Sequence, residues 1–364
     1  MTPYETLKQD LIESPRTWLV TGAAGFIGSN LVLELLRCGQ RVIGIDNLST
    51  GSLRNLEEVE REVGRACWAS FTWRKGDICD RELCRRACAG VDVVLHQAAL
   101  GSVPRSIAHP DQTNHSNVNG FLSMLLAAKD AGVPRFVYAS SSSVYGDHPG
   151  LPKVEERVGE CLSPYAVSKK VNEMYAAVFG RCYGTECIGL RYFNVFGARQ
   201  SPTGPYAAVI PKWIDSMLRG EPVVIHGDGE TSRDFCYVEN VVQANLLAAT
   251  VGDPEALNTV FNISAGGRTS LNELYGMLKS RLIEECPDLP DVAPIYHDFR
   301  PGDIRHSNAD IGKARRLLGY EPTHQIDAGL DAALEWYLAN AVSVREHGYG
   351  KASRSRLGDL VPMP

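Results

Sequence analysis

Two side chains near the middle of the chain could together move a proton: the phenol of Tyr165 and the ammonium of Lys169. They lie four residues apart, and Pro164 suits the first turn of a helix, so both should lie on one helical face. A phenol has a pKa of about 10 and is a poor base at neutral pH. A neighbouring ammonium favours the phenolate and lowers that pKa, which would make Tyr165 a usable acid–base group. Because this spacing is common on helices, its meaning depends on the rest of the chain.

A glycine-rich turn near the N-terminus offers a place for a phosphate. It reads Thr21-Gly-Ala-Ala-Gly-Phe-Ile-Gly28, follows a short apolar segment at residues 17–20, and precedes an amphipathic helical pattern at residues 29–36. A strand, such a turn and a helix N-terminus together direct backbone N–H groups at a pyrophosphate. The residues expected to contact it are Gly22, Gly25, Phe26, Ile27 and Gly28.

An acidic residue at the end of the next apolar stretch indicates which dinucleotide would bind. Asp46 closes residues 41–46 and lies 18 residues after Gly28, where a carboxylate can accept both ribose hydroxyls of an adenosine. The same carboxylate would repel a 2′-phosphate, so the sequence favours NAD over NADP. The alternative, that Asp46 is only a turn residue before Asn47, is weakened by the glycines upstream.

Apolar and helical stretches alternate through the first half of the chain. We expect strands at residues 71–78, 91–99, 135–139 and 187–194, a long helix at 110–131, and a charged, loop-like connection at 52–70. Alternation of this kind predicts an α/β fold, a doubly wound parallel sheet of Rossmann type that binds ligands outside the carboxyl ends of its strands. The serine run at 140–143 ends one of these strands, so it should meet Tyr165 at that edge.

The pattern changes after residue 195, where loops with glycine and proline and shorter elements begin. We expect a smaller α/β substrate domain that is interleaved with the first and is not a separate C-terminal module. The expected division is an N-terminal helical extension at 1–15, an NAD-binding Rossmann domain at 16–195 with 234–260 packed back on it, a substrate-binding domain at 196–233 and 261–344, and a tail at 345–364.

Composition narrows the choice of partners. The 364 residues are 44% hydrophobic and 22% charged, with a formal net charge of −6, which is ordinary for a soluble protein and gives no support for binding nucleic acid or a membrane. No apolar run reaches the length of a membrane span, and the N-terminus is unlike a secretory signal. The ten cysteines show neither a Cys-x-x-Cys pair nor a zinc spacing, so we expect reduced thiols, no metal and a cytoplasmic protein.

These separated features resemble one family. The glycine turn, Asp46, the pair at 77–78, Ser141, Tyr165 and Lys169 occur in the order typical of the extended short-chain dehydrogenase/reductases, and the resemblance covers roughly residues 17–340. The stretches 191–197, 233–234 and 300–303 further resemble nucleotide-sugar 4-epimerases. The stretches 99–106 and 305–307 look most like bacterial UDP-N-acetylglucosamine 4-epimerases.

The resemblance implies a mechanism in which NAD stays bound and is regenerated in each cycle. Tyr165 as phenolate would take the O4 proton of the sugar while hydride leaves C4, and Ser141 would hydrogen-bond O4. Lys169 would bind the nicotinamide ribose and, with the cationic ring, lower the Tyr165 pKa. The flat 4-keto sugar would then turn about its diphosphate linkage and take hydride back on its other face. Arg233 and Arg300 suit the diphosphate because guanidinium groups match phosphate oxygens, with ordinary surface ion pairs as the alternative.

The resemblance also implies further contacts. For the cofactor they are Asn47, Ser49, Thr50, Gly51, Asp77, Ile78, Gln97, Ala98, Ala99, Ser116 and Phe193, besides the glycine turn, Asp46, Tyr165 and Lys169. For the substrate they are Gly101, Ser102, Ser141, Ser142, Ser143, Tyr165, Asn194, Val209, Lys212, Arg233, Arg300, Asp303 and Ser307.

The serine run separates the chain from some relatives. Sugar 4,6-dehydratases and UDP-glucuronate decarboxylases of this superfamily carry acidic residues where this chain has Ser142 and Ser143. Without a carboxylate, elimination across C5–C6 lacks its proton carrier. The resemblance therefore implies epimerisation alone.

The expected substrate rests on Ser307. In this family the matching position is bulky in enzymes confined to UDP-glucose and UDP-galactose and small in those that accept N-acetyl sugars, so a serine favours UDP-N-acetylglucosamine and UDP-N-acetylgalactosamine. The alternatives are that Ser307 is an incidental loop residue, that the substrates are UDP-glucose and UDP-galactose, or that they are UDP-hexuronic acids whose carboxylate Arg105 could bind. A non-catalytic NAD-binding sensor is a further alternative. Family members usually pair through two long helices, here 110–131 and 165–183, which predicts a homodimer.

Overall fold

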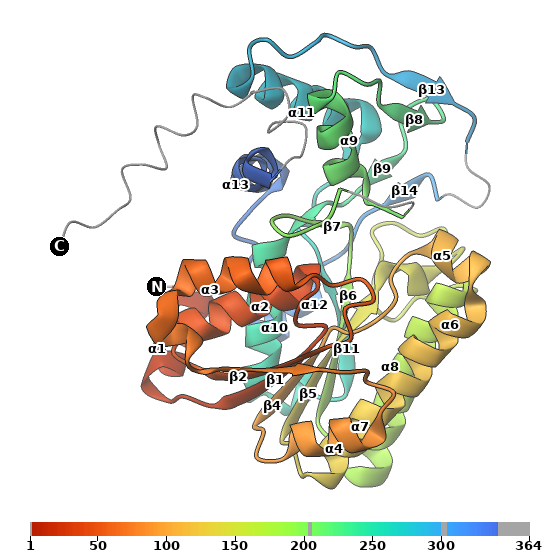
Figure 1. Cartoon of the computed structure of the whole chain (residues 1–364). Coiled ribbons are helices and arrows are strands. Elements are labelled where there is room, and N and C mark those ends of the chain that lie inside the picture. Colours follow the sequence, from red (N-terminus) through yellow and green to blue (C-terminus); the bar gives the residue numbers. More distant parts are fainter. Residues whose placement is uncertain (1, 203–205, 300–303, 341–364) are drawn as a thin grey trace, which may run out of the picture.

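The computed structural model describes residues 2–202, 206–299 and 304–340, which form a larger and a smaller lobe (Figure 1). The expected contacts Arg300 and Asp303 and the tail at 345–364 lie outside these residues. The larger lobe is built on a seven-stranded parallel sheet with the order β11-β6-β5-β4-β1-β2-β3. Its strands are β1 (Thr17–Thr21), β2 (Arg41–Asp46), β3 (Phe71–Lys75), β4 (Val93–His96), β5 (Arg135–Ser141), β6 (Cys187–Tyr192) and β11 (Thr259–Ile263).

The order of the strands reverses beside β1. The chain places β2 and β3 on one side of it and the later strands on the other, so β1 and β4 are neighbours with Val20 opposite Leu95. In a doubly wound sheet a ligand crevice opens at such a reversal, outside the carboxyl ends of the strands. The predicted α/β fold class is confirmed.

Helices cover both faces of the sheet (Figure 1) because its central strands are apolar on both sides, β4 being buried throughout. One face carries α1 (Pro3–Glu13), α2 (Phe26–Arg37), α3 (Leu53–Trp68), α10 (Val238–Thr250) and α12 (Gly312–Leu318). The other carries α4 (Arg81–Cys88), α7 (Phe121–Asp130) and α8 (Pro164–Tyr183). The short elements α5 (Val103–Ala108), η2 (Ser142–Tyr145) and η3 (Pro254–Ala256) lie in the connections.

The connection at 52–70 is a helix, α3, and the prediction of a loop there is wrong. Ser52 caps it by accepting a hydrogen bond from Arg54 N, and Leu56 and Val59 bury one face of it. The many charged residues lie on the other faces, so the segment is amphipathic and packs beside α2. Gly64, with a φ of 73°, breaks the helix near its end.

The long helix expected at 110–131 has a π-helical centre. It consists of α6 (Pro110–Asn114), the π segment η1 (His115–Gly120) and α7 in sequence. Gly120 ends the π segment where a Cβ would lie 2.6 Å from Ile78 Cδ1. Residues of η1 are therefore placed close to the loop after β3.

The smaller lobe has its own hydrophobic core, formed mainly by α9 (Val209–Leu218), α11 (Leu271–Glu285) and α13 (Ile326–Asn340). Its short strands pair as β7 (Val195–Phe196) with β10 (Cys236–Tyr237), as β8 (Val224–His226) with β13 (Ile295–His297), and as β9 (Ser232–Arg233) between β12 (Thr269–Ser270) and β14 (His306–Ser307). Segments far apart in sequence thus build one lobe.

The expected division of the chain needs a correction at residue 260, because that boundary falls inside β11. Phe261 lies opposite Leu190 of β6, so β11 is part of the central sheet. The strand continues past residue 260 because Phe261 and Ile263 are fully buried where β11 pairs with β6. Among the described residues, no helix is both long and apolar enough to cross a bilayer.

Candidate active site

The turn between β1 and α2 leaves no room for side chains. Gly22 has a φ of 69°, a left-handed conformation that favours glycine, and a Cβ there would lie 2.9 Å from Ala98 N. A Cβ on Gly28 would lie 2.0 Å from the carbonyl oxygen of Gly22, so the first turn of α2 packs directly on backbone. Gly25 caps α2 without a side-chain hydrogen bond, which leaves the first N–H groups of the helix available to an anion.

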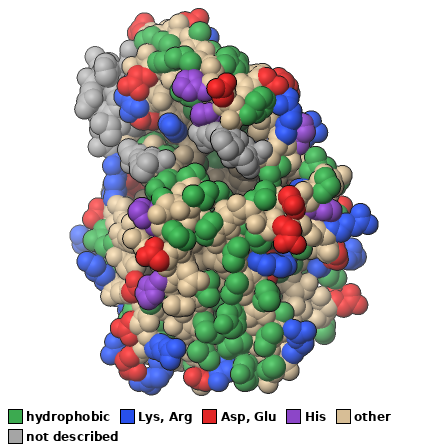
Figure 2. All heavy atoms as spheres, turned by 90° about the vertical axis from the view of Figure 1, so that its right-hand side faces the viewer, with side chains coloured by type: hydrophobic (Ala, Val, Ile, Leu, Met, Phe, Trp, Pro, Cys, Tyr) green, Lys and Arg blue, Asp and Glu red, His purple; other side chains and the backbone are tan. Residues whose placement is uncertain are grey.

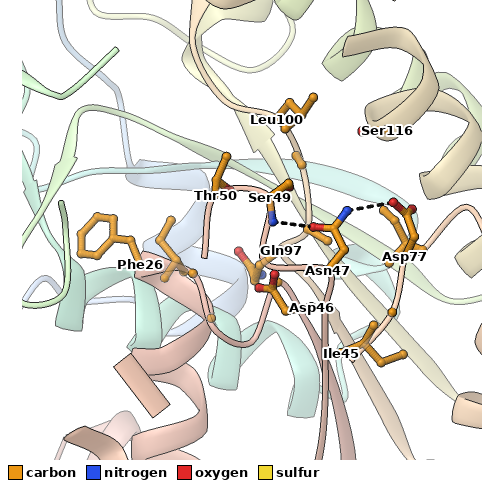
Figure 3. Close-up of a pocket in the computed structure, with 18 residues that line it drawn as sticks. Phe26, Ile45, Asp46, Asn47, Ser49, Thr50, Asp77, Gln97, Leu100 and Ser116 are labelled. Atoms are coloured by element: carbon orange, nitrogen blue, oxygen red, sulfur yellow. Dashed lines mark hydrogen bonds between the residues drawn. The ribbon is translucent and has the colours of Figure 1, made fainter. Parts of the chain in front are cut away.

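A pocket opens beside this turn, at the carboxyl ends of β1, β2 and β4 (Figure 3). It is lined by Gly22, Gly25, Phe26, Ile27, Gly28, Ile45, Asp46, Asn47, Ser49, Thr50, Gly76, Asp77, Ile78, Gln97, Ala98, Ala99, Leu100 and Ser116. The sequence does not predict Ile45, Gly76 or Leu100 as site residues. Each is next to a predicted residue in the chain, which is the signal that could have identified it.

Four residues that we expected at the cofactor are not part of this lining. Gly51 lies just behind it, because a Cβ there would be 2.9 Å from the Oδ2 atom of Asp46. Phe193 is fully buried after β6 and donates its N–H to Ile263 O at 3.1 Å. Tyr165 and Lys169 lie on α8, beside the end of β5.

Asp46 ends β2 and points into the pocket (Figure 3). Its Oδ2 accepts a hydrogen bond from Ala24 N at 3.1 Å and its Oδ1 accepts one from Leu48 N at 2.7 Å. Burial raises the pKa of this carboxyl, while the backbone donors act in the opposite direction. Each oxygen keeps acceptor capacity for a sugar hydroxyl.

The loops after β2 and β3 are tied together across the pocket. Asn47 donates from Nδ2 to Asp77 Oδ2 at 2.8 Å and accepts from Ser49 N at 2.9 Å (Figure 3). Burial of Asp77 would raise its pKa, but hydrogen bonds from Cys79 and Asn47 lower it. The ionised Asp77 therefore fixes one rim of the pocket.

The helix α8 begins where the sequence predicts and presents both of the predicted catalytic residues on one face. Ser163 caps it by accepting from Ala166 N at 3.1 Å, with Pro164 as the first helical residue. Lys169 Nζ lies 6.0 Å from the centre of the Tyr165 ring. The first two turns of α8 thus bring Tyr165 and Lys169 together as predicted.

The end of β5 completes this cluster. Lys169 is buried and donates to Ala139 O at 2.8 Å, and a side-chain hydrogen bond joins Tyr165 to Ser141. Ser141 Oγ also accepts from Ser143 N at 3.1 Å and from Ser143 Oγ at 2.9 Å. With its lone pairs engaged, Ser141 donates its own proton towards Tyr165, the direction that stabilises a phenolate.

The acid–base properties of the pair differ from the expectation. Burial raises the pKa of Tyr165, and the hydrogen bond with Ser141 only partly offsets the rise. The expected lowering by Lys169 does not occur in the chain alone, where burial and Ser141 set the pKa of Tyr165; the cationic ring that completes that expectation is not part of the chain. Burial also lowers the pKa of Lys169 to about 8, and Glu173 opposes this change.

Asn117 holds a loop of the pocket in place, and the sequence does not reveal it. Its Oδ1 accepts from Leu100 N at 2.7 Å, and its Nδ2 donates to Leu100 O and to Ser168 Oγ, each at 3.1 Å. It thereby ties the loop that lines the pocket to α8, between Tyr165 and Lys169. These partners are 17 and 51 residues away, so no local pattern signals the contact.

Two of the expected substrate residues are neighbours in the smaller lobe. Arg233 on β9 lies opposite Ser307 on β14 in a parallel register. Arg233 donates from Nη1 to Ser232 O at 2.9 Å. The guanidinium and the hydroxyl are therefore held on adjacent strands.

The other expected substrate residues come from several elements. Val209 and Lys212 lie in the first turn of α9, Asn194 lies between β6 and β7, and Gly101 and Ser102 precede α5. Ser102 caps α5 at a φ of 100°, and such strain is often found at functional sites. Among the described residues, no group of three His, Cys, Asp or Glu side chains could hold a metal ion.

Comparison with known proteins identifies the family. The profile of the NAD dependent epimerase/dehydratase family matches residues 18–264. The chain belongs to this family. A UDP-glucose 4-epimerase of Mycolicibacterium smegmatis is 36% identical over 88% of this chain and 97% of its own length. UDP-glucuronate 4-epimerase 4 of Arabidopsis thaliana is 31% identical over 89% of this chain and 75% of its own.

A solved structure of a family member superimposes over most of the chain. UDP-N-acetylglucosamine 4-epimerase of Methanobrevibacter ruminantium, in complex with UDP-N-acetylmuramic acid, gives a TM-score of 0.81 at 37% identity and covers 89% of this chain and 99% of that one. The family uses NAD, and the pocket fits it: a glycine cradle that a Cβ would fill, open N–H groups on α2, and the carboxylate of Asp46. NAD is thus the cofactor of this epimerase/dehydratase.

Replacement of Gly28 by alanine should weaken NAD binding. The new Cβ meets the Gly22 carbonyl at 2.0 Å, so α2 must move away from the turn, at a cost of about 1–3 kcal/mol in stability. We expect less NAD to be released from the denatured, purified variant than from the wild type. Gly276→Ala on α11, where a Cβ meets nothing within 4 Å, is the matched control and should retain full NAD. An unchanged NAD content in Gly28→Ala would contradict the proposed role of the glycine turn in binding NAD.

Proposed function

We propose that this protein interconverts UDP-N-acetylglucosamine and UDP-N-acetylgalactosamine by reversible 4-epimerisation through a 4-keto sugar. The observation that carries the proposal is the cluster of Tyr165, Lys169 and Ser141 at the carboxyl edge of the sheet that forms the NAD pocket. By their names, the relatives act on UDP-glucose, UDP-glucuronate and UDP-N-acetylglucosamine. A UDP-sugar 4-epimerase is the activity that they support in common.

The residues of the chain handle the proton. Bound NAD would supply the hydride chemistry at C4 of the sugar. Tyr165 takes the O4 proton as the C4–H bond breaks and the C4=O bond forms, and it gives the proton back when hydride returns. When the sugar is bound, Ser141 would turn its one hydroxyl proton from Tyr165 to O4, and the Lys169 ammonium would favour the phenolate.

The diphosphate has to stay anchored while the sugar turns over. Arg233 is suited to this role because its guanidinium can form two parallel hydrogen bonds to phosphate oxygens. Arg300, which lies outside the described residues, is proposed as a second anchor. The keto sugar itself must be held loosely enough to turn over, so that C4 can be reduced from its other face.

In this proposal the size of the Ser307 side chain determines which sugar the site accepts. It is half-buried on β14, next to Arg233 on β9, so a ligand anchored by Arg233 would extend past its small side chain. A large side chain at this position would occupy the volume proposed for the acetamido group.

UDP-hexuronic acids are the second candidate substrates, and Arg105 is the residue that favours them. Its guanidinium carbon lies 4.9 Å from the centre of the Tyr206 ring, a cation–π contact that restrains the charge. UDP-glucose and UDP-galactose complete the set of pairs to be assayed. Any turnover of these sugars argues against a non-catalytic sensor.

Replacement of Tyr165 by phenylalanine should abolish most of the activity. The ring stays in place, but the proton acceptor is lost, so kcat should fall by about 10²–10⁴-fold, while the protein still contains NAD. Product formation can be followed by chromatography of the UDP-sugars. Tyr183→Phe, an exposed tyrosine on the same helix, should retain wild-type turnover. Wild-type activity in Tyr165→Phe would mean that another group moves the proton.

Replacement of Ser307 by tyrosine should change the substrate preference. We expect turnover of the N-acetyl sugars to fall by about 10–200-fold, the effect of steric exclusion from a pocket, while UDP-glucose and UDP-galactose are affected less. Ser307→Ala keeps the space and should leave both substrate pairs unchanged. Equal losses for both pairs in the tyrosine variant would refute the steric argument.

The exposed face of α8 is proposed to pair two copies of the chain. Val167, Met174 and Val178 are hydrophobic and 49%, 60% and 40% exposed, at helical spacing. Figure 2 shows hydrophobic side chains gathered over this side of the larger lobe. A surface of this kind favours association through α8 and the neighbouring α7.

Charges on this face should separate the two copies. We expect the wild type to sediment as a dimer and Met174→Glu/Val178→Glu to sediment as a monomer, because burying two carboxylates in an apolar interface is unfavourable. Ile12→Glu, an exposed apolar residue on α1, controls for the added charge. A monomeric wild type would exclude this interface.

A further inference from the structure

Three side chains spaced four residues apart on α8 reach three consecutive residues of β5. The contacts are Tyr165 with Ser141, Lys169 Nζ with Ala139 O at 2.8 Å, and Glu173 Oε1 with Ser140 Oγ at 2.6 Å. The first two involve the residues of the proposed mechanism. The third has no part in that mechanism, although it lies on the same helical face.

Glu173 is a buried carboxylate with every oxygen engaged. Arg191 on β6 donates to it twice, from Nε to Oε1 at 2.8 Å and from Nη2 to Oε2 at 2.9 Å. Lys170 adds an ion pair at 3.6 Å. Burial would raise the pKa of Glu173, but the hydrogen bonds and charge of Arg191 hold it below the usual range. Glu173 is therefore ionised and fixed in position.

The surroundings of Lys169 make this charge important. On α8 it faces Tyr165 and Glu173. From β4 it faces His96, whose pKa is lowered to about 3, first by burial and then by Lys169, so this imidazole is neutral. From β6, Arg191 lies behind Glu173. The negative charge acting on the Lys169 ammonium thus comes from Glu173.

We propose that Glu173 is a positioning residue for the epimerisation: it fixes α8 against β5, and its charge keeps Lys169 protonated beside Tyr165. The proposal rests on the proposed function for its kinetic readout alone. It does not depend on which UDP-sugar is the substrate, because none of the contacts involves the smaller lobe.

The charges of Glu173 and Lys169 determine in which direction the pH dependence of kcat should change. Burial lowers the pKa of Lys169 to about 8, and the carboxylate of Glu173 raises it. As the pH rises through this value, Lys169 loses its proton, the phenolate of Tyr165 loses its support, and kcat should fall. Without Glu173 the pKa of Lys169 is lower still. The alkaline fall in kcat should then begin at lower pH, by about one unit, the low end of the pKa shift that a nearby opposite charge produces.

The experiment compares holoenzymes that keep their shape. Glu173→Gln removes the charge but leaves the buried charge of Arg191 without its counter-ion, which can prevent folding. The second variant, Glu173→Gln/Arg191→Met, removes both charges together and avoids this cost. Glu155→Gln is the matched control, since Glu155 is also buried in this region but binds Asn262 N instead. Kinetics across pH are accompanied by circular dichroism, NAD content, and ultraviolet titration of the Tyr165 phenolate against a Tyr165→Phe reference.

We expect the alkaline fall in kcat to move to lower pH in the variants that lack Glu173, with KM changed less than kcat, and to stay in place in Glu155→Gln. With oxidised NAD bound, whose cationic ring is expected to bring the Tyr165 pKa below that of Lys169, the titration of the Tyr165 phenolate should move in the opposite direction, to higher pH. A folded, NAD-containing double variant with the wild-type profile and phenolate titration overturns the proposal. If the wild type turns over no UDP-sugar, the proposed function fails, whereas the phenolate titration, which needs no substrate, still decides the role of Glu173.

Discussion

A parallel sheet brings the carboxyl ends of all its strands to one edge, and the cofactor pocket depends on this constraint. The pocket forms where β1 and β4 meet, because the connections from these two strands leave in opposite directions. The close approach of α2 to the turn after β1 then requires Gly22 and Gly28 to lack side chains. Backbone geometry, more than any single side chain, creates the site for a dinucleotide.

Burial of charge is the second organising factor. Lys169, Glu173 and Arg191 are all nearly inaccessible to solvent, and a charge in such a place must be paired or must shift its pKa. Glu173 and Arg191 pair, whereas Lys169 is left with a backbone carbonyl and a lowered pKa. The difference leaves the Lys169 ammonium sensitive to its surroundings at the proposed site of proton transfer.

Much of the larger lobe was predictable because its signals are local. The strand β2 covers the whole apolar stretch that the sequence shows at 41–46, and the glycine turn, Asp46 and the start of α8 are evident from short patterns. The sequence does not predict the helix α3, because many of its residues are charged and its apolar stripe is narrow. Contacts across long separations could not be read at all: Asn117 with Leu100 and Ser168, or Ser307 beside Arg233, depend on how distant segments meet. The raised pKa of Tyr165 likewise results from tertiary burial.

The π segment η1 has a consequence for the evolution of the chain. A π turn holds about one more residue than an α turn, and each residue added to a helix rotates the remainder of that helix by about 100°. Asn117 within it and Phe121 after it therefore point to their partners only at the present length. Loss of one residue here would keep the segment helical yet turn either the amide from Leu100 or the phenyl ring from the core. Insertions and deletions should accordingly be tolerated in the loops on either side and selected against between Pro110 and Asp130.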